Sequence, residues 1–217
     1  MENKEKRLTI ALTIAALSIS AGAFTAFADE GDVEISEANF PDAAFMEYVK
    51  QFDTITKDGK LSQDEIAAVK GISVSGKKIT DLSGIEFFTA VTELDCRGNQ
   101  LTALDLSKNT ALTSLTCNNN KLTSLDLSQN TALTGLFCSS NKLTELNISG
   151  CDAIEDINCN RNNLTELDVK NKASLLNLEC SYNQLGTLDL SGTALERLEC
   201  SGNSLAELDL SNCGKLT

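Results

Sequence analysis

Leucine residues recur at a fixed spacing through the C-terminal part of the chain. The stretch LTSLTCNNNKLTSLDLSQNTA begins at Leu112 and is followed at Leu133 by an altered copy, LTGLFCSSNKLTELNISGCDA. Aligned on their cysteines, the copies give the unit LxxLxCxxNxLxxLDLSxNxx, with steps of 21, 21, 21, 21 and 20 residues between Cys96, Cys117, Cys138, Cys159, Cys180 and Cys200. A period of this size predicts a solenoid with one coil per repeat, because stacked coils can bury an apolar edge that a single coil cannot.

The unit resembles the leucine-rich repeat, whose pattern is LxxLxLxxNxL, with cysteine in the third apolar position. Its second half, LxxLDLSxN, repeats the pattern out of phase. The chain is therefore similar to the nested bacterial 21-residue type and to the repeats of internalins over about residues 71–217. The resemblance implies an α/β-type repeat solenoid with one parallel β-strand per coil, formed by Leu-x-Cys, and an extended Leu-Asp-Leu segment on the opposite side. Residues 71–91 fit as a first, irregular coil through Ile72, Val74, Ile79, Leu82, Ile85 and Phe88.

The repeated cysteine has a structural interpretation. Alternation along Leu-x-Cys sends Leu and Cys inward and the residue between them outward, and Cys is small and commonly buried. A disulfide stack or a metal ladder is the alternative. In-register neighbours lie about 4.8 Å apart, whereas a disulfide needs Cβ atoms near about 3.8 Å, so we expect buried free thiols. Two further cysteines, Cys151 and Cys213, occupy a different position, where other coils are expected to have Asn109, Asn130 or Asn171.

An asparagine follows each repeat cysteine by three residues. These residues are Asn99, Asn120, Asn141, Asn162, Asn183 and Asn203. A buried Asn side chain can bond to backbone groups at the turn that leaves the strand. We interpret this column as a structural ladder.

Residues 29–70 lack the 21-residue period and contain two stretches of helical spacing, FPDAAFMEYVKQF and LSQDEIAAVKG. Ser62 and Glu65 form a capping-box pair for the second stretch. The intervening DTITKDGKLSQDE resembles an EF-hand or dockerin-like calcium loop with Glu65 at the bidentate position. Thr54 and Thr56 fall at the first two ligand positions, however, which removes most of the charge that Ca²⁺ requires. We therefore expect a helical N-terminal cap whose degenerate EF-hand-like loop binds Ca²⁺ weakly or not at all.

Residues 1–28 have the features of a secretory signal peptide. The polar start MENKEKR precedes the apolar run LTIALTIAALSISAGAF, and Ala26-Phe27-Ala28 fits the A-x-A cleavage pattern. An uncleaved membrane anchor is the alternative, because the apolar run is about long enough to span a bilayer. Cleavage predicts a secreted or cell-surface protein with no membrane insertion afterwards. At the other end the chain stops at Thr217 just as another coil begins, and we expect that this end is truncated.

The composition excludes several classes of function. The chain contains no His, which removes the proton shuttle of Ser-His-Asp and Cys-His catalysis and any His-bearing zinc site. The net charge is -13, and it becomes -14 without residues 1–28, which carry +1. This balance disfavours binding to a phosphate backbone, so no nucleic-acid partner is expected. Without a nucleophile–base pair or a phosphate loop, we expect no catalytic residues, no cofactor and no enzyme activity.

The two long faces predicted for the solenoid differ in how much they vary. The Leu-Asp-Leu face repeats Asp and Ser, which indicates Asp side chains that accept turn N–H groups; a cation ladder of stacked carboxylates is the alternative. The Leu-x-Cys face varies in charge, size and polarity, as expected for a recognition surface, although drift and a chance exposed apolar residue would leave the same pattern. The candidate ligand-binding residues on this face are Phe137, Thr116, Asn158, Asp156, Glu179, Asp95, Arg97, Arg197 and Glu199.

These observations predict a secreted or cell-surface leucine-rich repeat module that binds a protein or glycan ligand on the Leu-x-Cys face. The family resemblance implies adhesion or host-surface interaction as the commonest theme. The alternative is an accessory repeat domain of a larger secreted enzyme whose catalytic part is not in this chain.

Overall fold

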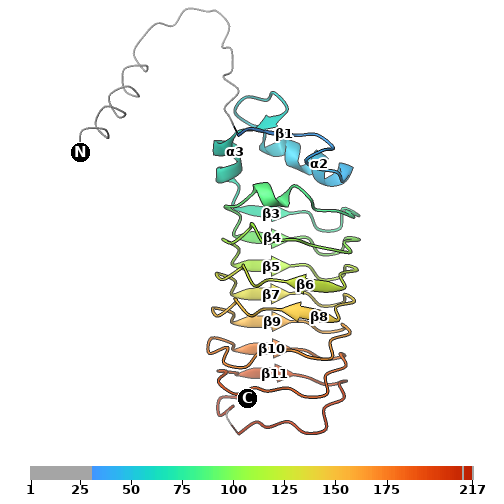
Figure 1. The fold of residues 1–217 in the computed structure, drawn as a ribbon, viewed down its shortest axis with the longest axis vertical. Coiled ribbons are helices and arrows are strands. Elements are labelled where there is room, and N and C mark those ends of the chain that lie inside the picture. Colours follow the sequence, from blue (N-terminus) through green and yellow to red (C-terminus); the bar gives the residue numbers. More distant parts are fainter. Residues whose placement is uncertain (1–30, 212, 217) are drawn as a thin grey trace, which may run out of the picture.

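The computed structural model describes residues 31–211 and 213–216, and the expected signal peptide lies outside this part of the chain. Its coils stack into an elongated solenoid with parallel strands along one long face (Figure 1). The strands lie in chain order: β3 (Gly71–Ser73), β4 (Glu93–Asp95), β5 (Ser114–Thr116), β7 (Gly135–Phe137), β9 (Asp156–Asn158), β10 (Asn177–Glu179) and β11 (Arg197–Glu199). Their central Leu or Ile residues pair in register from strand to strand. The predicted leucine-rich repeat solenoid is confirmed.

From β4 to β11, each strand of this sheet is centred on the apolar residue two positions before a repeat cysteine, and the cysteine follows directly after the strand; after β3 this position holds Val74. In the repeat that contains β5, Leu115 and Cys117 are fully buried while Thr116 between them is partly exposed. This alternation is that of a strand with one buried face. Each fully buried Leu contributes about 2 kcal/mol of transfer free energy, so the stacked Leu columns are the main stabilising element of the coils.

The segment on the opposite side forms a regular strand in two coils of the described chain. These strands are β6 (Ser124–Asp126) and β8 (Glu145–Asn147), and they pair in parallel. The pairing extends through two further backbone bonds, from Leu127 N–H to the Asn147 carbonyl (2.8 Å) and from Thr144 N–H to the Thr123 carbonyl (2.9 Å).

The asparagine ladder joins each coil to both of its neighbours. The amide of Asn120 donates to the carbonyls of Cys96 and Cys117, each at 3.0 Å, and its Oδ1 accepts from Leu101 N–H at 3.1 Å. The same three bonds recur, with small changes of distance, at Asn99, Asn141, Asn162, Asn183 and Asn203. The structural interpretation of this column is confirmed.

A second ladder lies on the other side of the coils, and here one sequence assignment is wrong. Asn109 and Asn130 donate to carbonyls of the preceding coil, and Cys151 takes the next position with its thiol 3.3 Å from the Leu127 carbonyl. The following position holds Lys172, not Asn171. Lys172 is 6% exposed, and its Nζ donates to the Ser149 carbonyl (3.2 Å) and to Asp152 (2.9 Å). Asn171 instead occupies the left-handed turn position beside it, with φ 60°.

A small helical segment lies over the N-terminal end of the solenoid (Figure 1). It consists of β1 (Val33–Glu34), α2 (Ala43–Val49), η2 (Lys50–Phe52), β2 (Lys60–Leu61) and α3 (Gln63–Ala68), and β1 pairs antiparallel with β2. No helix of the described ranges is both long and apolar enough to cross a lipid bilayer.

Aromatic packing joins this segment to the first coil. The buried ring of Phe40 lies 5.8 Å from Phe87 and 6.4 Å from Phe88, centroid to centroid, and Phe52 lies 5.6 Å from Phe88. Gly84 permits the contact: its φ is 100°, and a Cβ there would lie 2.3 Å from a ring carbon of Phe40. A larger residue at this position would therefore separate the helical segment from η3 (Ile85–Phe87).

The loop between α2 and α3 is closed by the Glu65 carboxylate. One oxygen accepts from the N–H groups of Thr54 (2.6 Å) and Ile55 (2.7 Å), and the other accepts from the N–H (2.9 Å) and hydroxyl (2.8 Å) of Ser62. The predicted capping box of Ser62 and Glu65 is confirmed. Burial raises the pKa of Glu65, but these hydrogen bonds outweigh it and leave the pKa below its usual range. The two oxygens of Glu65, the residue at the bidentate position of the loop, thus already accept hydrogen bonds from four protein groups.

All eight cysteines are free thiols, and seven of them are buried, Cys200 being half-buried. Loss of solvation raises the pKa of Cys96, Cys138 and Cys180 to about 12, from an ordinary value of 9.0. It also raises the pKa of Cys117 and Cys159 well above that value. The predicted burial of the repeat cysteines is confirmed except at Cys200, which lies in a coil near the end of the described chain.

The protein is expected to lose stability steeply between about pH 9 and pH 12. Unfolded thiols release their protons near pH 9 whereas the folded thiols keep theirs, so the folded state binds more protons in this window and the free energy of unfolding falls as the pH rises. Each buried thiol contributes about 1.4 kcal/mol per pH unit there. Urea unfolding at a series of alkaline pH values measures the slope. The double variant Cys117→Ala, Cys138→Ala should show a shallower slope, and an unchanged slope would contradict the assignment.

Alkylation with iodoacetamide at neutral pH provides a second measurement on the same thiols. Mass spectrometry should show the five deeply buried repeat cysteines unmodified in native protein and modified in urea, because only the thiolate reacts. Disulfides joining consecutive ladder cysteines in native protein would contradict the free-thiol interpretation.

The loop from Asp53 to Glu65 is expected to bind Ca²⁺ weakly or not at all. Thr54 and Thr56 supply no carboxylate, and the oxygens of Glu65 are already bonded to the loop backbone. Titration calorimetry should show no micromolar binding, while Glu65→Gln should destabilise the fold by about 1–3 kcal/mol through loss of charged hydrogen bonds. Micromolar affinity that disappears in Glu65→Gln would instead establish a functional calcium loop.

Candidate binding surface

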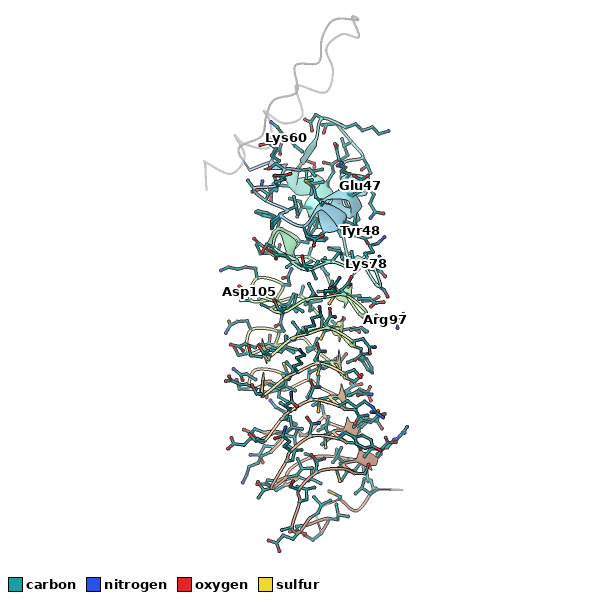
Figure 2. The ribbon with its side chains drawn as sticks, turned by 90° about the vertical axis from the view of Figure 1, so that its right-hand side faces the viewer. Glu47, Tyr48, Lys60, Lys78, Arg97 and Asp105 are labelled. Carbon is teal, nitrogen blue, oxygen red and sulfur yellow. The ribbon has the colours of Figure 1, made fainter. Side chains whose placement is uncertain are left out.

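The outward side chains of the seven-stranded sheet form a continuous surface, which we call the sheet face. It comprises the first and third residues of β4, β5, β7, β9, β10 and β11, together with the residue that follows each repeat cysteine. Figure 2 shows Arg97, from this face, and Asp105, from the opposite face, on opposite sides of the stack. All nine candidate residues lie on the sheet face, because strand alternation turns them away from the Leu and Cys columns.

Phe137 lies at the middle of the sheet face and is 36% exposed. Its ring rests against its own strand: a Cβ added to Gly135 would lie 3.4 Å from a ring carbon of Phe137. The missing side chain at Gly135 therefore leaves the space over which the ring lies. Among its neighbours in the same column, Thr116 and Asn158 are polar and partly exposed. The face thus presents one aromatic side chain between polar ones.

A connected polar network covers the C-terminal half of the sheet face. Glu179 Oε2 accepts from Asn158 Nδ2 at 2.6 Å and from Asn160 Nδ2 at 3.1 Å, and its Oε1 lies 3.9 Å from Arg197. Arg197 also pairs with Glu199. These contacts hold four of the candidate residues in one group, while Asp156 lies beside it and bonds to Asn177.

The N-terminal half of the sheet face contains a hollow of about 250 Å³. Tyr48 of α2 lines it together with residues of β3, β4 and β5; the lining is Tyr48, Gly71, Ile72, Ser73, Glu93, Leu94, Asp95, Ser114 and Thr116. The Tyr48 hydroxyl accepts from Ser73 N–H at 3.0 Å, which fixes the ring over β3. Asp95 pairs with Arg97 at 3.3 Å, so the structure brings three candidate residues, Asp95, Arg97 and Thr116, to this hollow or its edge.

Another aromatic residue, Tyr182, lies at the rim and is 54% exposed. It occupies a left-handed position with φ 58°, and the Arg161 guanidinium lies 4.7 Å from its ring centroid. On its other side a Cβ at Gly202 would lie 2.8 Å from a ring carbon. Tyr182 is therefore held between adjacent coils, which distinguishes it from Phe137.

The opposite face uses its carboxylates to close its own turns. Asp126 Oδ1 accepts from Ser128 N–H at 2.9 Å and from Asn147 Nδ2 at 3.0 Å, and hydrogen bonds from Ser128 are the main reason that its pKa lies below the usual range. The same bond to the residue two positions on recurs at Asp105, Asn147, Asp168, Asp189 and Asp209. The predicted turn-closing role of this column is confirmed. In the described ranges, no group of three or more His, Cys, Asp or Glu side chains is arranged to hold a metal ion.

Sequence reasoning missed the role of Tyr48, which belongs to the helical segment and reaches the sheet only through the packing of that segment on the first coil. It also missed Asn160 and Asn177, although each lies in an outward column and 19 or 21 residues from its partner. A spacing of 21 residues is one coil and a spacing of 19 is a diagonal step to the next coil, so the repeat period was the signal that could have identified these pairs.

Comparison with known proteins agrees with this architecture. The family profile described as "Leucine Rich repeat" matches residues 118–135 and 139–157. Internalin J of Listeria monocytogenes serotype 4b is 40% identical over 71 residues, which are 33% of this chain and 8% of that protein.

Two solved structures extend the comparison to most of the chain. Internalin C2 of Listeria monocytogenes has a TM-score of 0.59 at 17% identity, over 85% of this chain and 95% of that one. A functional domain of InlJ from Listeria monocytogenes, described as including a cysteine ladder, has 30% identity and a TM-score of 0.49, over 86% of this chain and 51% of that one.

The chain thus spans a small part of internalin J and about half of the InlJ domain. The repeat unit, the matching family profile and the solenoid carry the assignment. The chain is a leucine-rich repeat solenoid that is similar to bacterial internalins.

Proposed function

We propose that this chain is a secreted or cell-surface binding module that recognises a protein or glycan ligand through its sheet face. The observation that carries the proposal is the exposed Phe137 on a face whose residues change from coil to coil, opposite a face whose Asp side chains close turns. Aromatic residues are enriched at interfaces, and repeat proteins present their varied face to partners. Residues 1–28 would direct export, 29–70 would cap the solenoid, and 71–217 would carry the binding surface.

Binding rather than catalysis is favoured by the chemistry of the face. It contains no His, and its carboxylates lie among amides, hydroxyls and guanidinium groups without a nucleophile beside a base. The internalin-like relatives make a surface-associated adhesive role the leading form of the proposal.

Phe137→Ala is expected to weaken ligand binding by about 1 kcal/mol or more, as for a central aromatic anchor. The measurement is the affinity of the purified chain for a ligand identified on a glycan array or a panel of purified extracellular proteins. Phe137→Ala should leave the free energy of unfolding nearly unchanged, because the side chain lies outside the core.

Asp126→Ala on the opposite face serves as the control. It removes the bonds to Ser128 and Asn147, and should lower stability by about 1 kcal/mol while leaving the affinity unchanged. If Asp126→Ala stays folded and loses the ligand while Phe137→Ala retains it, the assignment of the two faces is wrong.

A further inference from the structure

The third residues of successive strands form a column on the sheet face in which Phe137 lies between two polar residues, with one acidic residue beyond each of them. In chain order from β4 to β10 these residues are Asp95, Thr116, Phe137, Asn158 and Glu179. Asp95 on β4 lies two strands before Phe137, and Glu179 on β10 lies two strands after it. Neighbouring strands are about 4.8 Å apart, so each carboxylate lies about 10 Å from Phe137 along the solenoid. A straight segment crossing the strands would therefore meet a negative charge, an aromatic ring and a second negative charge at equal intervals.

The charge of the sheet face favours a cationic partner. The net charge of the sheet-face residues is -3, because they include five carboxylates and two guanidinium groups. The carboxylates are Glu93, Asp95, Asp156, Glu179 and Glu199, and the guanidinium groups are Arg97 and Arg197. Both arginine side chains are 58% exposed in their ion pairs. Exposed ion pairs of this kind contribute little free energy, so a basic partner could replace them at small cost.

The hollow beside Tyr48 is lined by Asp95, the first of these carboxylates, so this position can select a partner side chain by its shape as well as by its charge. At about 250 Å³ it is smaller than the usual pocket for a small-molecule ligand, and its size suits one long side chain. Asp95 lies in it with Glu93, whose backbone N–H donates to the Lys70 carbonyl but whose carboxylate makes no hydrogen bond or ion pair within residues 31–211 and 213–216. Lys77 Nζ lies 5.6 Å from the centroid of the Tyr48 ring, so this ring already has one cation at its face.

We propose that the partner of the sheet face is a basic, extended protein segment that lies along the solenoid axis. This inference rests on the proposed function and names the chemistry of its ligand. A Lys or Arg side chain enters the hollow between Tyr48 and the carboxylates of Glu93 and Asp95, an apolar side chain contacts Phe137, and a second basic side chain reaches Glu179. An extended segment in the polyproline II conformation rises about 3.1 Å per residue with three residues per turn, so side chains three residues apart lie on one side of it at about 9 Å spacing. The three contacts are therefore three residues apart in the partner.

The test uses the purified chain as bait for random linear peptides displayed on phage. Enriched peptides are expected to carry net positive charge, with Lys or Arg three positions before and after an apolar residue. The synthetic peptide Lys-Ser-Ser-Leu-Ser-Ser-Lys should bind, and the same peptide with Glu in place of Lys should not. Binding should weaken as ionic strength rises from about 0.05 M to about 0.5 M, because the contacts are exposed charges.

Charge-neutralising variants separate local contacts from bulk charge. Asp95→Asn with Glu179→Gln should lower affinity at least about tenfold, as expected for two lost charge contacts. The control pair Asp105→Asn with Asp168→Asn removes the same charge from the opposite face and keeps a side-chain oxygen for each turn, so affinity should hold. An equal loss with both pairs would show that net charge alone attracts the peptide, and would overturn the inference.

The remaining outcomes distinguish this inference from the proposed function. Enrichment of neutral or acidic peptides whose binding is lost in Phe137→Ala would overturn the basic-segment assignment while supporting the sheet face as the binding surface. An affinity that is unchanged in every sheet-face variant would contradict the proposed function itself. A selection that enriches no peptide over background would also overturn the inference.

Discussion

The hydrogen bonds of the ladder asparagines set the register of the coils, on which the surfaces of the solenoid depend. Each side chain bonds to carbonyls of two successive coils and accepts an N–H from one of them, as Asn120 does between Cys96 and Cys117. The groups that it satisfies lie in buried turns, where an unpaired carbonyl or N–H would cost about 1–3 kcal/mol. Because the same three bonds recur in successive coils, they fix the register of one coil on the next. The alignment of outward residues into columns follows from that register.

The register also separates the two long faces by chemistry. On the opposite face, carboxylates such as Asp126 accept N–H groups of their own turns, which couples those side chains to folding. On the sheet face the strand backbone is paired with neighbouring strands, and only some outward side chains, such as Asp95 and Asn158, also accept the N–H of the residue two positions on. Glu179 bonds to side chains of an adjacent coil, and Glu93, the first residue of β4, lines the hollow. A module built in this way can change most of its sheet face while keeping the asparagine ladder that holds its coils in register.

The repeat period made most of the solenoid predictable from sequence. Strand alternation placed Leu115 and Cys117 inside and Thr116 outside, and the spacing of Asn120 from its cysteine identified the ladder. The second ladder was harder to predict, because its position holds Asn, Cys or Lys in different coils. After Asn130 the residue type therefore no longer identified the ladder residue. Lys172 fits there since its ammonium group reaches the Ser149 carbonyl and Asp152. The hollow beside Tyr48 could not be predicted, because it exists only where the helical segment packs on the first coil.

The position of Phe137 shows how a neighbouring residue sets the character of a binding surface. A phenylalanine standing upright on a polar sheet would expose most of its ring, but Gly135 lets the ring lie against the strand, where it is 36% exposed. The ring is then partly desolvated before any partner arrives, and less side-chain freedom remains to be lost on binding. The carboxylates on either side are about 10 Å away along the solenoid, too far to bond to one another and close enough for one extended segment to reach all three. Selectivity at such a surface comes from the spacing that the coil register imposes more than from the strength of any single contact.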